Sequence, residues 1–374
     1  LRVDRPARSS RRLAGPAQRP QDAASRPQDR ADPMPTRPRI AAFAAALVGL
    51  AVFAAAGLPL PFLLGPMFGC LAAALSGVRL AGPAKAAGVF RAVLGVAVGA
   101  SITPELLGRL DQMAASVALI PLTVVAAGVL GVPYFTRLCG FDRPTAYFSA
   151  MPGGLQDMIM LGREAGADMR AIALVHVTRV LVIVALMPAI LEWGWGLSLD
   201  RPPGAPAAEI PPWELGLMLL AGWVGWGYAA RVGLFGASIL GPMAAAAALS
   251  LSGELTHRPP LEAILAAQFF IGLIVGAGYD GVTGRELRRV VAAALGFCVV
   301  LAALALAFAE GALRLGVAPR VDALLAFAPG GQAEMAVLAI VAGADVAYVV
   351  THHLARLIVV ILGAPLAARG MRGA

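Results

Sequence analysis

The chain has 374 residues, of which 59% are hydrophobic and only 14% are charged. A soluble domain carries roughly 25% charged residues, so this composition excludes an ordinary soluble enzyme. Apolar runs long enough to cross a bilayer recur along the chain, and they predict an all-α polytopic membrane protein.

The first 39 residues hold most of the excess positive charge. They contain ten arginines against four aspartates, out of a net charge of +8 for the whole chain. They are also rich in Pro, Ala, Gln and Ser without apolar periodicity, so residues 1–39 are predicted to be a disordered basic tail. Met34 is the predicted native start, with residues 1–33 as upstream sequence. Because the basic charge lies in this tail, we predict no nucleic-acid partner.

Twelve segments follow the tail in chain order, in two sets of six. Each set contains five apolar segments and one segment interrupted by Pro-Gly-Gly. The first set is expected at 40–57, 60–76, 86–101, 112–135, 144–162 (interrupted) and 169–191. The second set is expected at 214–232, 236–252, 262–278, 288–309, 323–342 (interrupted) and 345–367.

Short motifs recur between the two sets at a separation of 176 or 177 residues, which indicates a tandem duplication. We therefore predict one repeat at 40–200, a linker at 201–213 and a second repeat at 214–370. The recurring motifs are Leu64-Gly65-Pro66-Met67 with Leu240-Gly241-Pro242-Met243, Pro152-Gly153-Gly154 with Pro329-Gly330-Gly331, Gly166-Ala167-Asp168 with Gly343-Ala344-Asp345, and His176 and Arg179 with His353 and Arg356.

The distribution of Lys and Arg in short loops predicts the orientation. Both termini are expected in the cytoplasm and the acidic stretch 192–214 outside the inner membrane. These assignments agree if each Pro-Gly-Gly segment is a re-entrant hairpin that does not cross, which leaves five crossings per repeat. An odd number inverts the second repeat, as in secondary transporters. If the hairpins do cross, the repeats are parallel.

The Pro-Gly-Gly segments are the first candidate site residues: Pro152, Gly153 and Gly154, and Pro329, Gly330 and Gly331. Such a sequence interrupts a helix, and each is followed by an acid, Asp157 or Glu334, in apolar surroundings. A half-helix starting there presents backbone N–H groups and a carboxylate to a solute or a proton. The alternative is a simple kink in which the acid caps the first turn of the helix.

His176 and Arg179 share one helix face because they are three residues apart, and His353 and Arg356 repeat the arrangement. An arginine in the middle of a membrane needs a carboxylate, backbone carbonyls or an anion as its partner. The structural alternative is that these arginines hold Asp157 and Glu334 or free carbonyls at the hairpin tips. A neutral histidine suits proton coupling.

Gly65 and Pro66, with Gly241 and Pro242, are secondary candidates for a second interrupted helix, although helix packing explains them equally well. The three cysteines stand alone in apolar sequence, so neither a disulfide framework nor a metal site is predicted. No phosphate-binding loop or dinucleotide fingerprint is present in the sequence, and no cofactor is predicted.

The combination of LGPM, MPGGLQDM or APGGQAEM, and HVTR or HHLAR resembles the AbrB-type duplicated membrane protein family over residues 40–370. The resemblance implies an integral membrane protein with paired repeats. It also brings two labels used for family members, ammonia monooxygenase and AbrB-family regulator.

The residues favour an ion-coupled secondary transporter of a small, anionic solute, with its site between the repeats. In this prediction Asp157 and Glu334 carry the coupling ion, H⁺ or Na⁺, and Arg179 and Arg356 attract the solute. A membrane-bound metal-dependent monooxygenase is the alternative, although no clear ligand spacing supports an enzyme. A membrane sensor that affects gene expression indirectly is the second alternative.

Overall fold

A computed structural model describes residues 36–104, 110–199, 201–234 and 236–371. These residues form helices and turns, with no strand among them, so the predicted all-α fold is confirmed. The expectations for residues 1–35, including a start at Met34, lie outside the described residues. Residues 36–39, which were predicted to belong to the tail, are helical, because α1 begins at Thr36 and Pro38 is tolerated in a first helical turn.

The first half of the chain contains helices that follow the predicted segments closely. The interrupted segment 144–162 is a pair of short helices separated by the extended residues Met151–Gly154. The helices are α1 (Thr36–Ala55), α2 (Pro61–Leu75), α3 (Ala84–Gly99), α5 (Leu110–Val117), α6 (Ile120–Pro133) with η1 (Tyr134–Leu138), α7 (Arg143–Ala150), α8 (Leu155–Glu164) and α9 (Met169–Ala189) with η2 (Ile190–Gly194).

The second half repeats this order after a short linker helix. The segment 323–342 is again two helices, here separated at Ala328–Gly331. The helices are η3 (Ala207–Glu209), α10 (Pro212–Arg231), α11 (Ala237–Leu251), α12 (Leu261–Ala277), α13 (Gly284–Glu286) with η4 (Leu287–Val291), α14 (Ala292–Arg314), α15 (Arg320–Phe327), α16 (Gln332–Ala342) and α17 (Val346–Met371).

Within the described parts of the chain, five helical segments are long and apolar enough to cross a membrane: Thr36–Ala55, Met113–Leu138, Met169–Gly194, Gly284–Arg314 and Val346–Gly363. α10 has 20 residues but is not one of these five, and the remaining expected crossings are shorter, with only 15 residues each in α2 and α11. A helix of that length is about 22 Å long, against the roughly 30 Å of a hydrocarbon core. The expected ten crossings therefore stay a prediction.

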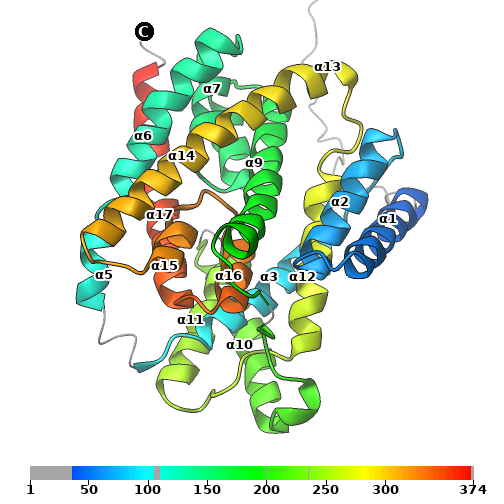
Figure 1. Ribbon diagram of the computed structural model, residues 1–374, viewed down its shortest axis with the longest axis vertical. Helices are drawn as coiled ribbons and strands as arrows, with labels where there is room; N and C mark the ends of the chain where they lie inside the picture. Colours follow the sequence, from blue (N-terminus) through cyan, green and yellow to red (C-terminus); the bar gives the residue numbers. More distant parts are fainter. Residues whose placement is uncertain (1–35, 105–109, 200, 235, 372–374) are drawn as a thin grey trace, which may run out of the picture. The chain divides into compact units, whose positions relative to one another are not determined.

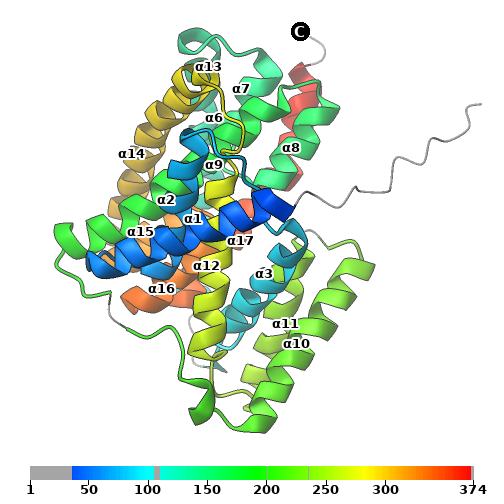
Figure 2. The same cartoon turned by 90° about the vertical axis from the view of Figure 1, so that its right-hand side faces the viewer.

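The third helix of each half packs against helices of the other half. α12 packs with α1 and α2, and α3 packs with α10 and α11 (Figure 2). Glycines allow the close approach, because a Cβ added at Gly95 or Gly99 of α3 would meet backbone oxygens of α11, and one at Gly272 or Gly276 of α12 would meet those of α2. The first two helices of each half thus form a three-helix group with the third helix of the other half.

The remaining long helices surround the two interrupted segments. α6 and α14 contact each other, while α14 also packs on α9 and α6 on α17 (Figure 1). The pair α7–α8 packs on α9, and the pair α15–α16 packs on α17. We call α7–α8 the first hairpin and α15–α16 the second hairpin. The helices that carry the predicted His–Arg pairs therefore also support the two hairpins.

Candidate functional site

The helices that carry the histidines and arginines begin at equivalent aspartates. The Asp168 side chain accepts hydrogen bonds from the backbone N–H groups of Arg170 and Ala171 at the start of α9. Asp345 does the same for Ala347 and Tyr348 in α17. Capping of this kind fixes where each helix starts, and hence the level at which its side chains meet the hairpin.

Each arginine of the two His–Arg pairs binds two carbonyl oxygens of the loop between the two helices of its hairpin. Arg179 donates to the carbonyls of Met151 at 3.1 Å and Gly153 at 2.8 Å. Arg356 donates to the carbonyls of Ala328 at 2.8 Å and Gly330 at 3.0 Å. The helix breaks leave these carbonyls without helical partners, so the guanidinium groups satisfy them inside an apolar protein.

The histidine of each pair, three residues before the arginine, binds a backbone carbonyl of the first helix of its hairpin. His176 donates from Nε2 to the carbonyl of Phe148 at 2.9 Å, and His353 donates from Nε2 to that of Leu325 at 2.9 Å. A carbonyl oxygen can only accept, so Nε2 carries the hydrogen in both rings. In the second hairpin alone, the His353 Nδ1 atom also accepts a hydrogen bond from Arg356, at 3.0 Å.

Asp157 and Glu334 occupy the first turn of α8 and α16, and both are buried. Their carboxylates lie over Gly154 and Gly331, where an added Cβ would overlap a carboxylate oxygen. The second glycine of each motif thus leaves room for the carboxylate in this position, and a larger residue there would force the acid side chain to move. A carboxylate at a helix N-terminus also lies at the positive end of the helix dipole.

The two interrupted segments meet at one small cavity. Pro152 and Pro329 both line it, together with Arg356 and side chains of α6 and α14. Its volume is about 20 Å³, which is room for roughly one water molecule. The other lining residues are Thr123, Ala127, Leu301, Leu304, Ala305 and Phe327.

The structure does not bring the arginines and the acids together as ion pairs. The ion pairs formed by the described residues involve neither Arg179 nor Arg356. The charges of both guanidiniums therefore remain uncompensated by a bonded carboxylate. Arg91 of α3 lies within electrostatic range of Glu334. In the sequence Arg91 is a lone arginine in an apolar segment, and the equivalent residue of the second half is the uncharged Gln268.

The LGPM motifs lie at helix crossings. An added Cβ at Gly65 of α2 would overlap the backbone of Gly49 and Leu50 in α1. One at Gly241 of α11 would overlap Gly225 in α10. Pro66 and Pro242 lie inside these same helices. The motif thus allows close contact between the first two helices of each half, which corresponds to the packing interpretation.

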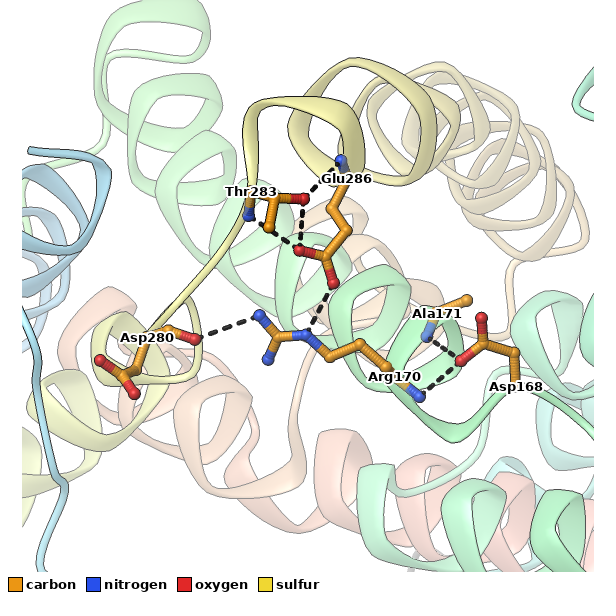
Figure 3. Close-up of polar contacts among 6 residues, drawn as sticks. All are labelled: Asp168, Arg170, Ala171, Asp280, Thr283 and Glu286. Carbon is orange, nitrogen blue, oxygen red and sulfur yellow. Dashed lines mark hydrogen bonds and ion pairs between the residues drawn. The ribbon is translucent and has the colours of Figure 1, made fainter. Parts of the chain in front are cut away.

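A polar cluster ties the start of α9 to the second half of the chain. Arg170 donates from Nε to Glu286 at 3.0 Å and from Nη2 to the backbone carbonyl of Asp280 at 3.1 Å (Figure 3). Glu286 in turn forms a capping box with Thr283. The equivalent of Arg170 in the second half is Ala347, which has no such side chain. Only α9, the helix that supports the first hairpin, therefore has these polar contacts to the other half of the chain.

The described residues contain no group of three or more His, Cys, Asp or Glu side chains placed to hold a metal ion. Cys70, Cys139 and Cys298 are free thiols.

The chain is similar to known proteins over most of its length. The family described as "Transition state regulatory protein AbrB" matches residues 62–372. The chain belongs to the AbrB family. It is 27% identical over 325 residues to "Putative regulator AbrB" of Escherichia coli K12, covering 85% of this chain and 91% of that protein. It is 26% identical over 288 residues to "Uncharacterized protein YhjN" of Bacillus subtilis 168, covering 72% and 74%.

The match to the AbrB family includes both hairpins and both His–Arg pairs of this chain. Together with the long apolar helices, it supports an AbrB-type protein of the membrane.

Proposed function

We propose that this AbrB-family protein is an ion-coupled secondary transporter of a small anionic solute. The observation that carries the proposal is the shared cavity, where Pro152 and Pro329 of two equivalent helix breaks meet beside Arg356. Interrupted helices that meet between two repeats form the solute sites of many secondary transporters. The proposed membrane is the bacterial inner membrane, with both termini in the cytoplasm.

The reciprocal packing of the two halves supports two repeats related by approximate two-fold symmetry. α3 packs on α11 as α12 packs on α2, which is the exchange expected for halves related by an approximate two-fold axis. Such an axis in the membrane plane would give the halves opposite topology and let them exchange roles when the site opens to the other side.

The charges at the hairpins suggest what is carried. Arg179 and Arg356 bind neutral carbonyls, so their positive charges remain available to attract an anion toward the cavity. The N-termini of α8 and α16 add further positive potential. Asp157 and Glu334 are buried acids at these same helix starts, and we propose that they exchange the coupling ion, H⁺ or Na⁺.

The cavity is too small for any solute beyond about one water molecule. Transport therefore requires a conformation in which the hairpins or the pair α6–α14 separate. The structure then corresponds to a closed conformation of the transporter.

Accessibility of the cavity tests the proposal without knowledge of the solute. Ala127 of α6 lines the cavity, whereas Val129 on the same helix is 65% exposed on the outer, apolar surface. In a background without Cys70, Cys139 and Cys298, we expect A127C to react with a small charged thiol reagent added to either side of the membrane. V129C should react from neither side, because lipid covers it. Reaction of A127C from one side only, or from neither, would contradict transport.

The orientation is tested at Ala167 and Ala344, which occupy equivalent turns before α9 and α17. Both have half-buried side chains. The neighbouring glycines are poorer choices, because Gly343 lies against the Arg201 side chain and both glycines have positive φ. We expect A167C to be labelled from the cytoplasm and A344C from the periplasm. Labelling of both from one side would establish parallel repeats.

A membrane sensor that affects gene expression is the second candidate, and it rests on the word "regulator" in the name of the Escherichia coli relative. A sensor could bind the same solute at the same hairpins without opening to both sides. The A127C experiment separates the two, since a sensor needs access from one side alone. For a monooxygenase, the described residues offer no metal-holding group that would support it.

A further inference from the structure

An apolar groove lies on the surface of the protein, where α1 passes α12 (Figure 2). Phe43 of α1, Pro83 in the loop before α3, and Phe270 and Leu273 of α12 line it. Its volume is about 430 Å³, which lies within the roughly 300–1,000 Å³ of small-molecule sites. Because Phe43 is 45% exposed, the groove is open to the surroundings of the protein.

Contacts within the fold hold both sides of this groove in place. The Ala81 N–H donates a hydrogen bond to the carbonyl of Pro38 at 3.2 Å, which fixes the loop before α3 beside the start of α1. The Phe270 ring lies 6.3 Å from that of Phe43 and stacks on Phe90 of α3 at 4.2 Å, measured between ring centroids. The groove is therefore part of the packed structure of α1, α3 and α12.

Arg39 is the charged residue among those that line the groove. Its side chain is exposed and forms no hydrogen bond or ion pair with the residues that the structure describes. The first turn of α1 contains no acid, and Arg37 adds a second positive charge there. Since α1 is long and apolar enough to cross a membrane, an arginine at its start lies near the membrane–water interface.

The second half of the chain has neither the charge nor the space of this groove. At the separation of 176 residues that aligns the two LGPM motifs, Leu215 is equivalent to Arg39, and Leu220 is equivalent to Ala44, another lining residue. The duplicated fold therefore accepts leucine at both positions. Arginine and alanine in the first half are not demanded by the packing of the helices.

The chemistry of the groove fits a phospholipid. Apart from Arg39 the lining is apolar, so water is a poor occupant, whereas an acyl chain fits such a surface. A guanidinium forms paired hydrogen bonds with a phosphate group. A lipid with a net negative charge is favoured over a zwitterionic lipid, because the amine of a zwitterionic headgroup opposes the attraction to the arginines.

We propose that this groove binds one anionic phospholipid, with an acyl chain along Phe43 and Phe270 and the phosphate on Arg39. The inference goes beyond the proposed transport, and it requires only that α1 lies in a membrane.

Native mass spectrometry of the full-length protein in detergent tests the headgroup contact. Phosphatidylglycerol and phosphatidylcholine with the same acyl chains are added in equal amounts. We expect the unaltered protein to retain phosphatidylglycerol about fivefold better, as for one basic residue at an anionic membrane surface, and R39Q to retain the two lipids equally. Equal retention of the two lipids by the unaltered protein would overturn the proposal.

R37Q is the matched control for R39Q. It removes the same charge two residues earlier, and Arg37 does not line the groove, because the helix turns it toward another side. The preference for phosphatidylglycerol should persist in R37Q. The arginines of residues 1–35 are the same in all three proteins, so a difference between them does not come from that segment. A loss of preference as large in R37Q as in R39Q would refute a specific role of Arg39.

A second pair of variants tests the acyl-chain contact. Ala44 lines the groove, whereas Ala54 lies on the same helix outside it, and both are exposed. A44F places a ring in the groove and should lower the retention of phosphatidylglycerol severalfold relative to A54F. Equal retention by the two variants would contradict the site. A dimer mass that is present in A54F and lost in A44F would assign the groove to a second copy of the chain instead.

The outcome is independent of the accessibility experiment on A127C. A lipid retained through Arg39 in a protein whose cavity opens to one side only would keep the lipid site and refute transport. A cavity open to both sides without a preference for the anionic lipid would keep transport and refute the lipid site.

Discussion

The first and second hairpins are held by equivalent bonds but have different surroundings. Residues Ala333–Val341 of α16 are all buried, whereas Met160, Arg163 and Glu164 of α8 are exposed. In the turn after α16 a Cβ added at Gly343 would meet the Arg201 side chain, while one added at Gly166 in the equivalent turn would meet nothing within 4 Å. The second hairpin is enclosed, and the first lies at the surface.

This difference suggests a division of work between two copies of one unit. An enclosed hairpin whose histidine and arginine are bonded to each other can serve as a fixed reference. A hairpin that is partly exposed can rearrange more readily when an ion binds or leaves. In this duplicated protein, the more exposed hairpin is therefore the better candidate for the moving part.

The largest expected effect comes from removing the arginine of each pair. Methionine keeps an apolar side chain of similar length but leaves two carbonyls of the loop without a donor. R356M also removes the donor that His353 Nδ1 binds. We expect a loss of about 3 kcal/mol of stability for R356M and about 2 kcal/mol for R179M. Thermal unfolding in detergent measures both. A larger loss for R179M would reverse the assignment of the second hairpin as the fixed one.

Amide hydrogen exchange should show a smaller difference between the hairpins. Because α8 is partly exposed, its amides are expected to exchange on the order of tenfold faster than those of α16. Mass spectrometry of peptides covering 155–164 and 332–342 compares them within one sample. Equal protection of the two peptides would argue against unequal mobility.

The smallest effect is expected at the ion pair between Arg170 and Glu286, which has no equivalent in the second half of the chain. Since Arg170 and Glu286 are partly exposed, R170A should cost at most about 1 kcal/mol, and high salt should reduce the difference from the unaltered protein. Thermal unfolding at two salt concentrations measures this. As a control, A347G changes the equivalent position before the second His–Arg pair, where the chain has no such ion pair. A salt-independent loss in R170A would mean that Arg170 acts through packing instead.

The sequence predicted the helices well, because apolar length and glycine or proline breaks are local signals. The His–Arg pairs were also predicted as pairs on one helix face, and the structure places them beside the Pro-Gly-Gly loops. Whether the arginines meet carboxylates or carbonyls was left open by the sequence. That choice depends on the level at which α9 and α17 pass the loops, which Asp168 and Asp345 help to set.

Other parts of the site carry no local signal. Thr123, Leu301 and Phe327 line the cavity as ordinary members of apolar helices, and only the packing of α6 against α14 makes them neighbours of the hairpins. Arg91 was visible as a charge in an apolar segment, but its approach to Glu334 depends on α3 crossing to the other half. Contacts between the two halves of the chain cannot be predicted from the periodicity of apolar residues in the sequence.

The exchange of third helices between the halves has a consequence for biosynthesis. When α3 leaves the ribosome, the surface that Gly95 and Gly99 fit does not yet exist, because α11 is encoded far downstream. The first half must therefore remain incompletely packed in the bilayer until α11 has been translated and can pack against α3. A gene cut within the linker 201–213 should yield two fragments that are unstable when expressed singly and that assemble when made together.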